Sequence, residues 1–172
     1  CVNEPDSVFE NVYKVEPGQM IRFRGGRISK HKYWDIAKVY HAKKCEGAGT
    51  YEEAKAELKA ILKEAVRRRM IADVPVGAFL SGGYDSSLVT ALAQDVGSEP
   101  VRTYSIGFHE ERYDEAGYAR EVARHLGTRH TELYIDEKAM FDMVESIPQY
   151  YDEPFADSSP TPSMLVAELA SR

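Results

Sequence analysis

Glycine, serine and aspartate residues gather between an apolar run and a helix-like segment, in the stretch Ser81–Ser87. Gly82 and Gly83 allow a tight turn in which backbone N–H groups can approach a ligand closely. The N-terminus of the helix that follows favours an anion, because its free N–H groups and its dipole face the ligand. These residue types predict a phosphate-binding loop, with hydroxyl donors from Ser81, Ser86 and Ser87.

Asp85 is the unusual member of this loop, because a carboxylate beside phosphates is repulsive unless a cation lies between them. Mg²⁺ prefers one or two carboxylates together with phosphate oxygens, so Asp85 is predicted to bind Mg²⁺. The alternative is an ordinary glycine-rich turn in which Asp85 caps the next helix. The complete seven-residue string favours a nucleotide site over that alternative.

Several other catalytic and phosphate-binding motifs do not fit this stretch. The chain contains no G-x-x-x-x-G-K-[ST] string, so no lysine is placed beside a transferred phosphoryl group. No G-x-G-x-x-G follows a strand, which excludes the dinucleotide fingerprint. A serine-nucleophile elbow would need glycine where Phe79 stands.

The segments around the loop alternate between predicted strands and predicted helices. Val76–Leu80 reads as a short buried strand, and residues 101–108 and 130–135 read as two further strands. This alternation predicts an α/β domain with a parallel sheet and helices on both faces. Ligands of such sheets bind beyond the carboxyl ends of the strands, where Ser81–Ser87 and Ile106 must both lie.

Capping residues predict where the intervening helices begin. The second of these helices is closed by Gly127 in a left-handed conformation, and the third is expected to run to about Ile147. The first is a long amphipathic helix that starts near Tyr51. The predicted caps of the three helices are Thr50, Asp114 and Asp136.

The first forty residues differ from this pattern. Met20–Arg24 predicts a strand, with Gly25-Gly26 as a turn into a return strand. A segment rich in lysine and glycine follows and is typical of a linker. The chain is therefore divided into a β hairpin segment, a linker and an α/β domain, at residues 1–40, 41–50 and 51–172.

The composition is that of an ordinary globular domain of 172 residues. A net charge of −6 does not suggest nucleic-acid binding, and no apolar run is long enough to span a membrane. Two cysteines form no disulfide or metal framework, which makes a cytoplasmic location the default. The chain begins without Met and ends within a helix-like run, which suggests a piece of a longer protein.

Three carboxylates stand close together in residues 150–160, a polar stretch that leads into a helix. Such a group could bind a metal or recognise an amino group, although acidic loops are usually only solvated. Glu153 and Asp157 are the candidate substrate-binding residues of this stretch.

The string Ser81–Ser87 resembles the PP-loop of the N-type ATP pyrophosphatases, which cleave ATP between the α- and β-phosphates. Its surroundings resemble the glutamine-dependent asparagine synthetases within that superfamily. The segments before residue 40 resemble the exit from the glutaminase domain of those enzymes. The matching segments are Pro17-Gly18, Tyr33–Asp35, Asp73–Leu80, Tyr104–Phe108, Tyr113–Glu115, Ala119, Ala123, Leu126-Gly127, His130, Glu132 and Asp152–Ser159.

This resemblance implies a doubly wound, adenine-nucleotide α-hydrolase-like (PP-loop) fold preceded by a small β segment. Leu80 and Ile106 would frame the adenine and ribose of ATP, and Asp85 would bind Mg²⁺. The residues implied to hold the pyrophosphate portion are Ser81, Gly82, Gly83, Ser86 and Ser87.

The implied reaction is ATP-dependent synthesis of asparagine. The β-carboxylate of aspartate would attack the α-phosphate of ATP, pyrophosphate would leave, and ammonia from glutamine would displace AMP. Two alternatives stay open. One is a related PP-loop enzyme that adenylates another carboxylate, such as a β-lactam synthetase-like enzyme or another amidotransferase. The other is a nucleotide-binding regulatory module without chemistry of its own.

The sequence also departs from the family pattern. Cys1 precedes Val2-Asn3, which lack the glycine context expected after the cysteine nucleophile of a glutaminase. The second nucleotide-site motif of the family, S-G-x-G-x-D-E, does not occur in these residues. We expect a glutaminase domain and a C-terminal remainder as partners in one chain, and a homodimer stays open. Alone, this chain is expected to bind ATP weakly at most and to synthesise nothing.

Overall fold

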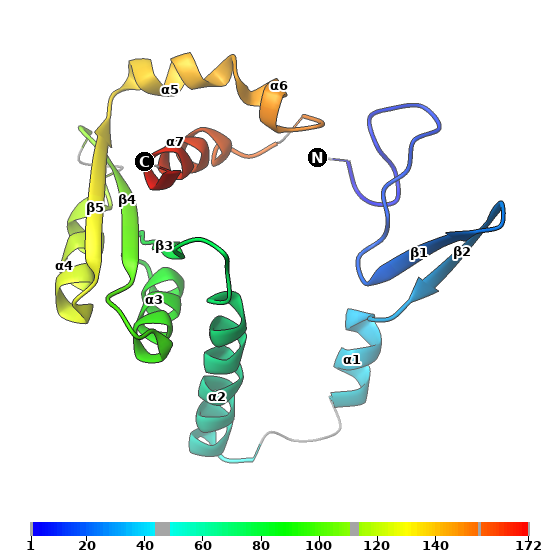
Figure 1. Cartoon of the computed structure of the whole chain (residues 1–172), viewed down its shortest axis with the longest axis horizontal. Helices are drawn as coiled ribbons and strands as arrows, with labels where there is room; N and C mark the ends of the chain where they lie inside the picture. The colour runs from blue at the N-terminus through cyan, green and yellow to red at the C-terminus, as the bar shows by residue number, and fades with distance from the viewer. Residues whose placement is uncertain (1, 44–48, 111–113, 155, 172) are drawn as a thin grey trace.

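The computed structural model describes residues 2–43, 49–110, 114–154 and 156–171. An antiparallel hairpin and two helices precede an alternation of strands and helices (Figure 1). In chain order the elements are β1 (Gln19–Arg24), β2 (Arg27–Lys32), α1 (Ile36–Lys43), α2 (Tyr51–Arg69), β3 (Gly77–Phe79), α3 (Tyr84–Val96), β4 (Arg102–Phe108), α4 (Ala116–Leu126), β5 (Arg129–Ile135), α5 (Glu137–Val144), α6 (Ile147–Tyr150) and α7 (Pro160–Ser171).

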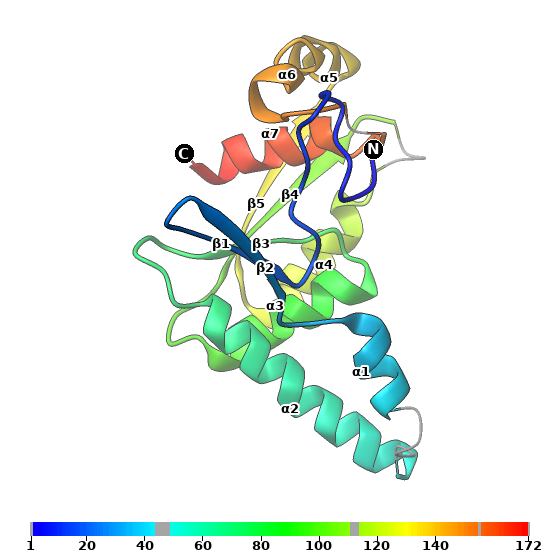
Figure 2. The same ribbon diagram turned by 90° about the vertical axis from the view of Figure 1, so that its right-hand side faces the viewer.

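The three strands of the second half form a parallel sheet in the order β3-β4-β5. Figures 1 and 2 show α4 and α7 on opposite sides of β4 and β5, and both helices contact β4. The fold is therefore α/β, with a parallel sheet wound on both faces, as the sequence predicts. Parallel strands joined by helices place their carboxyl ends at one edge, where a ligand can bind.

The core lies between the start of the predicted phosphate loop and α4. Leu80 is only 2% exposed and packs with Ala119 and Ala123, with Val122 at the side of the cluster. Small residues on the inner face of α4 let the helix approach the strand end closely. This packing fixes the loop that begins at Ser81 on the body of the domain.

The prediction of a buried first strand is wrong. The central strand β4 does bury alternate residues, but the side chain of Phe79 in β3 is 52% exposed. The reason is the position of β3 at an edge of the described sheet, where it pairs with β4 alone. Burial of this apolar run would need a neighbour on its free side.

The predicted hairpin is confirmed, with Phe23 paired to Ile28 beside the turn. Every residue of β2, and all of β1 except Gln19, is exposed. A short helix, α1, follows the hairpin within residues assigned to the N-terminal segment and the linker, and the sequence pattern did not predict it. The middle of the predicted linker, residues 44–48, lies outside the described residues.

Most of the predicted helix signals are confirmed. Thr50 and Glu53 form a reciprocal capping box: the Glu53 N–H donates to Thr50 Oγ1 at 3.3 Å, and Glu53 Oε2 accepts the Thr50 N–H at 2.7 Å. Asp136 Oδ1 accepts the N–H of Ala139 at 2.8 Å. Gly127 ends α4 with a φ of 70°.

Two helix boundaries differ from the prediction. The helix capped by Asp136 ends at Val144 instead of about Ile147, because the Ser146 hydroxyl turns back to the Met143 carbonyl at 2.7 Å. At α4 the cap position falls on Glu115, whose side chain makes no capping bond. Asp114 still serves the helix start, since its Oδ1 accepts the Ala116 N–H at 3.1 Å.

No helix within the described ranges is both long and apolar enough to cross a membrane.

Candidate functional site

The predicted phosphate loop is a compact turn held by its own serines. Ser81 Oγ and Ser86 Oγ lie 2.9 Å apart, and Ser86 Oγ donates to the Gly83 carbonyl at 3.2 Å. Ser86 Oγ also accepts the Ser81 N–H at 3.3 Å. The hydroxyls therefore preorganise the loop, and an anion arriving there would compete with weak internal hydrogen bonds.

Gly82 makes the closest approach between the loop and α4. Its φ is +82°, and a Cβ built on it would lie 2.6 Å from Tyr118 Cβ and 2.7 Å from the Ala119 backbone nitrogen. No side chain fits there, so the glycine is required by conformation and by space. Gly83 has an extended backbone and serves as the N-cap of α3, which starts at the loop.

Leu80, Ser81 and Ile106 line one hollow, of about 350 Å³, at the carboxyl edge of the sheet. Pro162, Ser163 and Val166 of α7 form its far wall. The structure therefore brings together the residues predicted to frame adenine and ribose, although the loop and Ile106 are separate in sequence. That Leu80 and Ile106 contact a nucleotide stays a prediction.

A second hollow, of about 330 Å³, lies on the other side of Ser81 and includes Gly82 and Gly83. A third and larger hollow, of about 1010 Å³, extends from Phe108 toward α5. Glu115 lines all three hollows, and Tyr118 lines the second. From the sequence, Glu115 was only part of a segment that resembles the asparagine synthetases, and Tyr118 had no predicted role.

Asp85 stands in the first turn of α3 with an exposed side chain. No group of three or more His, Cys, Asp and Glu residues gathers into a metal site among the described residues. Mg²⁺ often keeps several waters and binds through one carboxylate plus substrate phosphates. An exposed Asp85 beside a phosphate loop fits that mode of binding, and Mg²⁺ binding stays a prediction.

Ser87 is placed differently from the other two serines of the loop. Its Oγ is buried and has no hydrogen-bond partner within the described part of the chain. Ser81 and Ser86, by contrast, point their hydroxyls at one another across the loop opening. Contact between Ser87 and a phosphate stays a prediction.

A layer of polar side chains lies between the sheet and α4, beneath the strand that carries Ile106. His130 Nδ1 lies 2.9 Å from Thr103 Oγ1, and its Nε2 lies 3.3 Å from both Ser105 Oγ and Glu132 Oε1. Arg120 of α4 binds Glu132 through two hydrogen bonds of 2.8 and 2.5 Å. The layer joins β4, β5 and α4.

Burial and charge act in opposite directions within this layer. Burial lowers the pKa of His130, although neighbouring Glu132 acts to raise it. Hydrogen bonding from Arg120 lowers the pKa of Glu132. Neutral His130 and charged Glu132 are therefore favoured at neutral pH, and the layer is a structural support beneath the site.

The acidic stretch is held from a distant part of the chain. Lys14 Nζ forms an ion pair with Glu153 Oε1, and this hydrogen bond lowers the pKa of Glu153. Asp157 Oδ1 accepts the Ser159 N–H at 2.7 Å, just before α7. Neither carboxylate lines the hollows described above, whereas Ser158 lines the largest of them. Their role in substrate binding stays a prediction.

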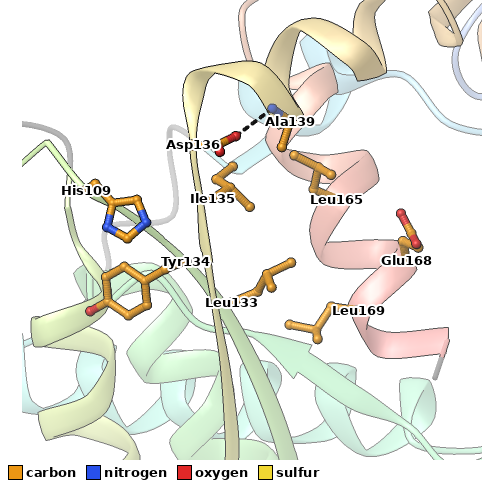
Figure 3. Close-up of a pocket in the computed structure, with 9 residues that line it drawn as sticks. All are labelled: His109, Leu133, Tyr134, Ile135, Asp136, Ala139, Leu165, Glu168 and Leu169. Atoms are coloured by element: carbon orange, nitrogen blue, oxygen red, sulfur yellow. Dashed lines mark hydrogen bonds between the residues drawn. The ribbon is translucent and has the colours of Figure 1, made fainter.

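Figure 3 shows another hollow, of about 290 Å³, between β5 and α7. Leu133, Leu165 and Leu169 lie around it, and Asp136 caps α5 at its edge. None of the residues predicted to bind nucleotide lines it. This hollow is mainly a gap in the packing of α7 on the outer strand.

Sequence reasoning did not find Lys14 or the wall formed by α7. Both come from segments far from the loop in sequence, and no local pattern marks them. Glu115 could have been found, because it stands directly after the predicted cap Asp114, at the start of the helix that follows β4.

An α/β sheet with a serine- and glycine-rich loop at its carboxyl edge defines a nucleotide-binding type of domain. Comparison with known families makes this class more specific. Residues 57–172 match the family model described as asparagine synthase, which is more than half of the chain. The chain belongs to the asparagine synthase family.

Individual relatives agree with this family. A Methanocaldococcus jannaschii protein, provisionally named asparagine synthetase [glutamine-hydrolyzing] 2, is 36% identical over 99% of this chain and 32% of its own length. Asparagine synthetase [glutamine-hydrolyzing] 1 of Bacillus subtilis is 31% identical over 99% of this chain and 26% of its own length. Amidase chry2 of Gibberella zeae is 33% identical over 93% of this chain and 26% of its own length.

The chain thus spans between about a quarter and a third of the length of these relatives. Among solved structures, a glutamine-dependent NAD⁺ synthetase from Acinetobacter baumannii in complex with ADP is 26% identical, with a TM-score of 0.49. That match covers 67% of this chain and 24% of the synthetase.

Proposed function

We propose that this chain supplies the ATP-binding part of an enzyme that activates a carboxylate as an adenylate and then amidates it. Membership of the asparagine synthase family supports this proposal. The observation that carries it is the shared hollow of Leu80, Ser81 and Ile106, beside a loop that ends in a helix N-terminus. Such a site suits a bound nucleotide with its phosphates at the loop.

In this proposal the loop holds the pyrophosphate portion of ATP through Ser81, Ser86 and the backbone of the two glycines. Ser87, whose buried Oγ has no hydrogen-bond partner within the described part of the chain, is the third proposed hydroxyl donor. Leu80 and Ile106 frame the adenine and ribose. The α-phosphate then faces the open edge of the sheet, where an attacking carboxylate can reach it. The protein contributes mainly by positioning two anions and by screening their charge.

The substrate that we propose is aspartate. A β-carboxylate oxygen attacks the α-phosphorus, the bond to the bridging oxygen breaks, and pyrophosphate leaves with the electron pair. Ammonia derived from glutamine then attacks the acyl carbon, loses a proton and displaces AMP to give asparagine. Two relatives with glutamine-hydrolyzing in their names support this choice. Asp157 is the proposed contact for the substrate amino group.

Mg²⁺ bound at Asp85 would screen the charge of the pyrophosphate as it forms. The glutaminase domain and the remainder of the synthetase part are proposed to belong to the same protein, which we place in the cytoplasm. A homodimer also remains a proposal.

A related enzyme that amidates a different carboxylate is the second candidate. The specific observation in its favour is that relatives at comparable identity are named amidases, chry2 of Gibberella zeae and chyE of Penicillium rubens. Selection of the carboxylate would then depend on residues around the largest hollow, where α5 and the start of α7 meet.

Exchange between ATP and labelled pyrophosphate tests both candidates on the complete protein that carries this chain. Exchange that depends on aspartate supports asparagine synthesis, and exchange with another acid supports the second candidate. Absence of exchange with every acid would leave a nucleotide-binding module and contradict both. Ser86→Ala should lower exchange, whereas Ser98→Ala, an exposed serine beyond the far end of α3, should not. The present chain alone should show weak ATP binding at most and no synthesis.

A further inference from the structure

The acidic stretch before α7 meets the N-terminal segment at Glu153, which contacts the Lys14 side chain and the backbone of Val8. Lys14 Nζ contacts Glu153 Oε1 and also donates to the Val2 carbonyl at 2.6 Å. Figures 1 and 2 both show the N-terminal segment beside the turn between α6 and α7. The two partners are 139 positions apart, so only the tertiary fold brings them together.

This ion pair is better enclosed than the described pairs that lie one helical turn apart on α2 and α5. The side chains of Lys14 and Glu153 are 26% and 23% exposed, whereas those of Lys138 and Asp142 on α5 are 82% and 65% exposed. Exposed pairs one helical turn apart contribute little. The pKa of Glu153 is lowered mainly by the hydrogen bond from Lys14, with a further contribution from the backbone of Val8. Glu153 is therefore negatively charged at neutral pH, and its Oε1 is engaged in the ion pair with Lys14.

Hydrogen bonds within the N-terminal loop connect its residues to one another, so the contact of Lys14 with Glu153 positions the loop as a unit. The Lys14 N–H donates to the Pro5 carbonyl at 2.8 Å, and the Ser7 hydroxyl donates to the Val12 carbonyl at 2.7 Å. The apolar side chains of the loop are exposed, including Tyr13 at 67%. Among the described residues of this loop no hydrophobic side chain is buried, so the contacts of Lys14 and Val8 with Glu153 attach the loop to the acidic stretch.

The acidic stretch leads directly to the site. Asp157 lies four residues after Glu153, and its carboxylate orders the turn into α7 by accepting the Ser159 N–H. The first two turns of α7 then supply Pro162, Ser163 and Val166 to the hollow shared with Ile106. A displacement of Glu153 would shift this wall of the hollow, because only a few residues of backbone separate Glu153 from the start of α7.

We propose that Lys14 and Glu153 are positioning residues, which hold the acidic stretch so that Asp157 and the start of α7 face the carboxylate substrate. Glu153 acts through Lys14 instead of contacting the substrate. This inference rests on the proposed function for the identity of the substrate, but not for the existence of the attachment. In this proposal the N-terminal segment contributes to the synthetase site by positioning its residues.

The test compares Lys14→Met and Glu153→Gln with the exposed-pair control Lys138→Met. Lys14→Met keeps an apolar stem and removes the charge, as does the control. Amide hydrogen exchange on the full protein should accelerate about tenfold or more in residues 151–159 for both test variants. Exchange in Ser81–Ser87 should not change, and Lys138→Met should leave both segments as in the wild type.

A kinetic readout separates positioning from simple stabilisation. In the pyrophosphate-exchange assay, Lys14→Met should raise KM for the carboxylate substrate about tenfold and change KM for ATP less than about twofold. The charge-reversed double variant, Lys14→Glu with Glu153→Lys, should recover most of the loss seen in either single reversal.

Unchanged hydrogen exchange in residues 151–159 of Lys14→Met would overturn the inference, as would a double variant no better than the single ones. A KM for ATP that rises as much as that for the acid would also contradict it. If the wild type exchanges pyrophosphate with no acid, the proposed function fails, and hydrogen exchange still decides whether the attachment exists.

Discussion

The predicted phosphate loop and the acidic stretch before α7 are held in opposite ways. The loop from Ser81 to Ser87 is fixed by contacts among its own residues, with the Ser81 and Ser86 hydroxyls 2.9 Å apart. The acidic stretch around Glu153 is attached instead through Lys14, from the other end of the chain. The proposed nucleotide side is thus a local structure that starts from the core at Leu80, whereas the proposed substrate side is contacted by a segment remote in sequence.

This difference has a consequence for how the site can be damaged. Changes near the nucleotide loop should cost stability, because the loop starts from the buried core at Leu80. Substitutions in the acidic stretch should change the free energy of unfolding little, and they should affect binding of the proposed carboxylate substrate instead.

Leu80→Ala should have the largest effect. Leu80 is 2% exposed and packs on Ala119 and Ala123, so its truncation leaves a cavity between the strand end and α4. The free energy of unfolding should fall by about 2–5 kcal/mol, measured by urea denaturation. The control Leu88→Ala, at a position 47% exposed, should cost less than about 1 kcal/mol. Equal losses in the two variants would contradict the assigned core.

Gly82→Ala should cost about 2 kcal/mol and weaken nucleotide binding at the same time. A methyl group at this position meets the backbone of α4, and the positive φ of 82° adds strain. Gly83→Ala is the matched control, since its Cβ would meet nothing closer than Ser81 Oγ at 3.4 Å. That variant should lose less than about 1 kcal/mol.

Urea denaturation measures the loss of unfolding free energy in both glycine variants. KM for ATP in the pyrophosphate-exchange assay measures the effect of each variant on nucleotide binding at the loop. The steric account would be wrong if Gly83→Ala were as harmful as Gly82→Ala.

The turn at Ser81–Ser87 and the helix that follows it were predictable because their signals are local, and nucleotide binding there stays a prediction. The string Ser81–Ser87, the caps Thr50 and Asp136, and the left-handed Gly127 each depend on a few neighbouring residues. Patterns of this range also predicted the order of strands and helices. The parallel sheet then followed from the alternation.

The errors and omissions concern long-range packing. The apolar character of Val76–Leu80 predicts burial, but β3 lies at an edge of the described sheet. No pattern could pair Lys14 with Glu153, because an exposed lysine and an exposed acid look alike in sequence whether or not they meet. Likewise, α1 is short and follows an exposed hairpin. Its cap, Asp35 Oδ1, accepts the N–H groups of Ala37 and Lys38 at 3.0 and 3.3 Å, and this local signal was not used to predict the helix.

The polar layer beneath β4 should give stability a pH dependence that originates from His130. Burial lowers the pKa of His130 below its ordinary value near 6.5, so the unfolded chain binds the proton more readily. Stability is therefore fully present above pH 6.5 and is lost as the pH falls through the lower pKa of the folded state. The effect should be smaller than that of Gly82→Ala, because a single group titrates.

Urea denaturation between pH 7.5 and about pH 5 measures this dependence, within the range where histidine titrates. His130→Gln should remove the part of the slope that lies below pH 6.5. The control His31→Gln changes an exposed histidine of the hairpin and should leave the slope unaltered. An identical slope in His130→Gln would show that another group is responsible.

Asp157→Asn should have the smallest effect on stability and a clear effect on the proposed chemistry. The amide oxygen of asparagine can still accept the Ser159 N–H, which Asp157 Oδ1 accepts at 2.7 Å. The free energy of unfolding should therefore change by less than about 0.5 kcal/mol. The lost negative charge should nevertheless raise KM for the carboxylate substrate about tenfold, if Asp157 meets an amino group.

Asp142→Asn, which neutralises an exposed carboxylate on α5, is the matched control and should change neither quantity. The free energy of unfolding and KM for the carboxylate substrate together decide whether Asp157 acts on stability or on substrate binding. A large loss of stability without a change in KM would make it a structural residue like those of the nucleotide loop. A rise in KM at constant stability would place it on the substrate side, where Lys14 and Glu153 hold the chain that carries it.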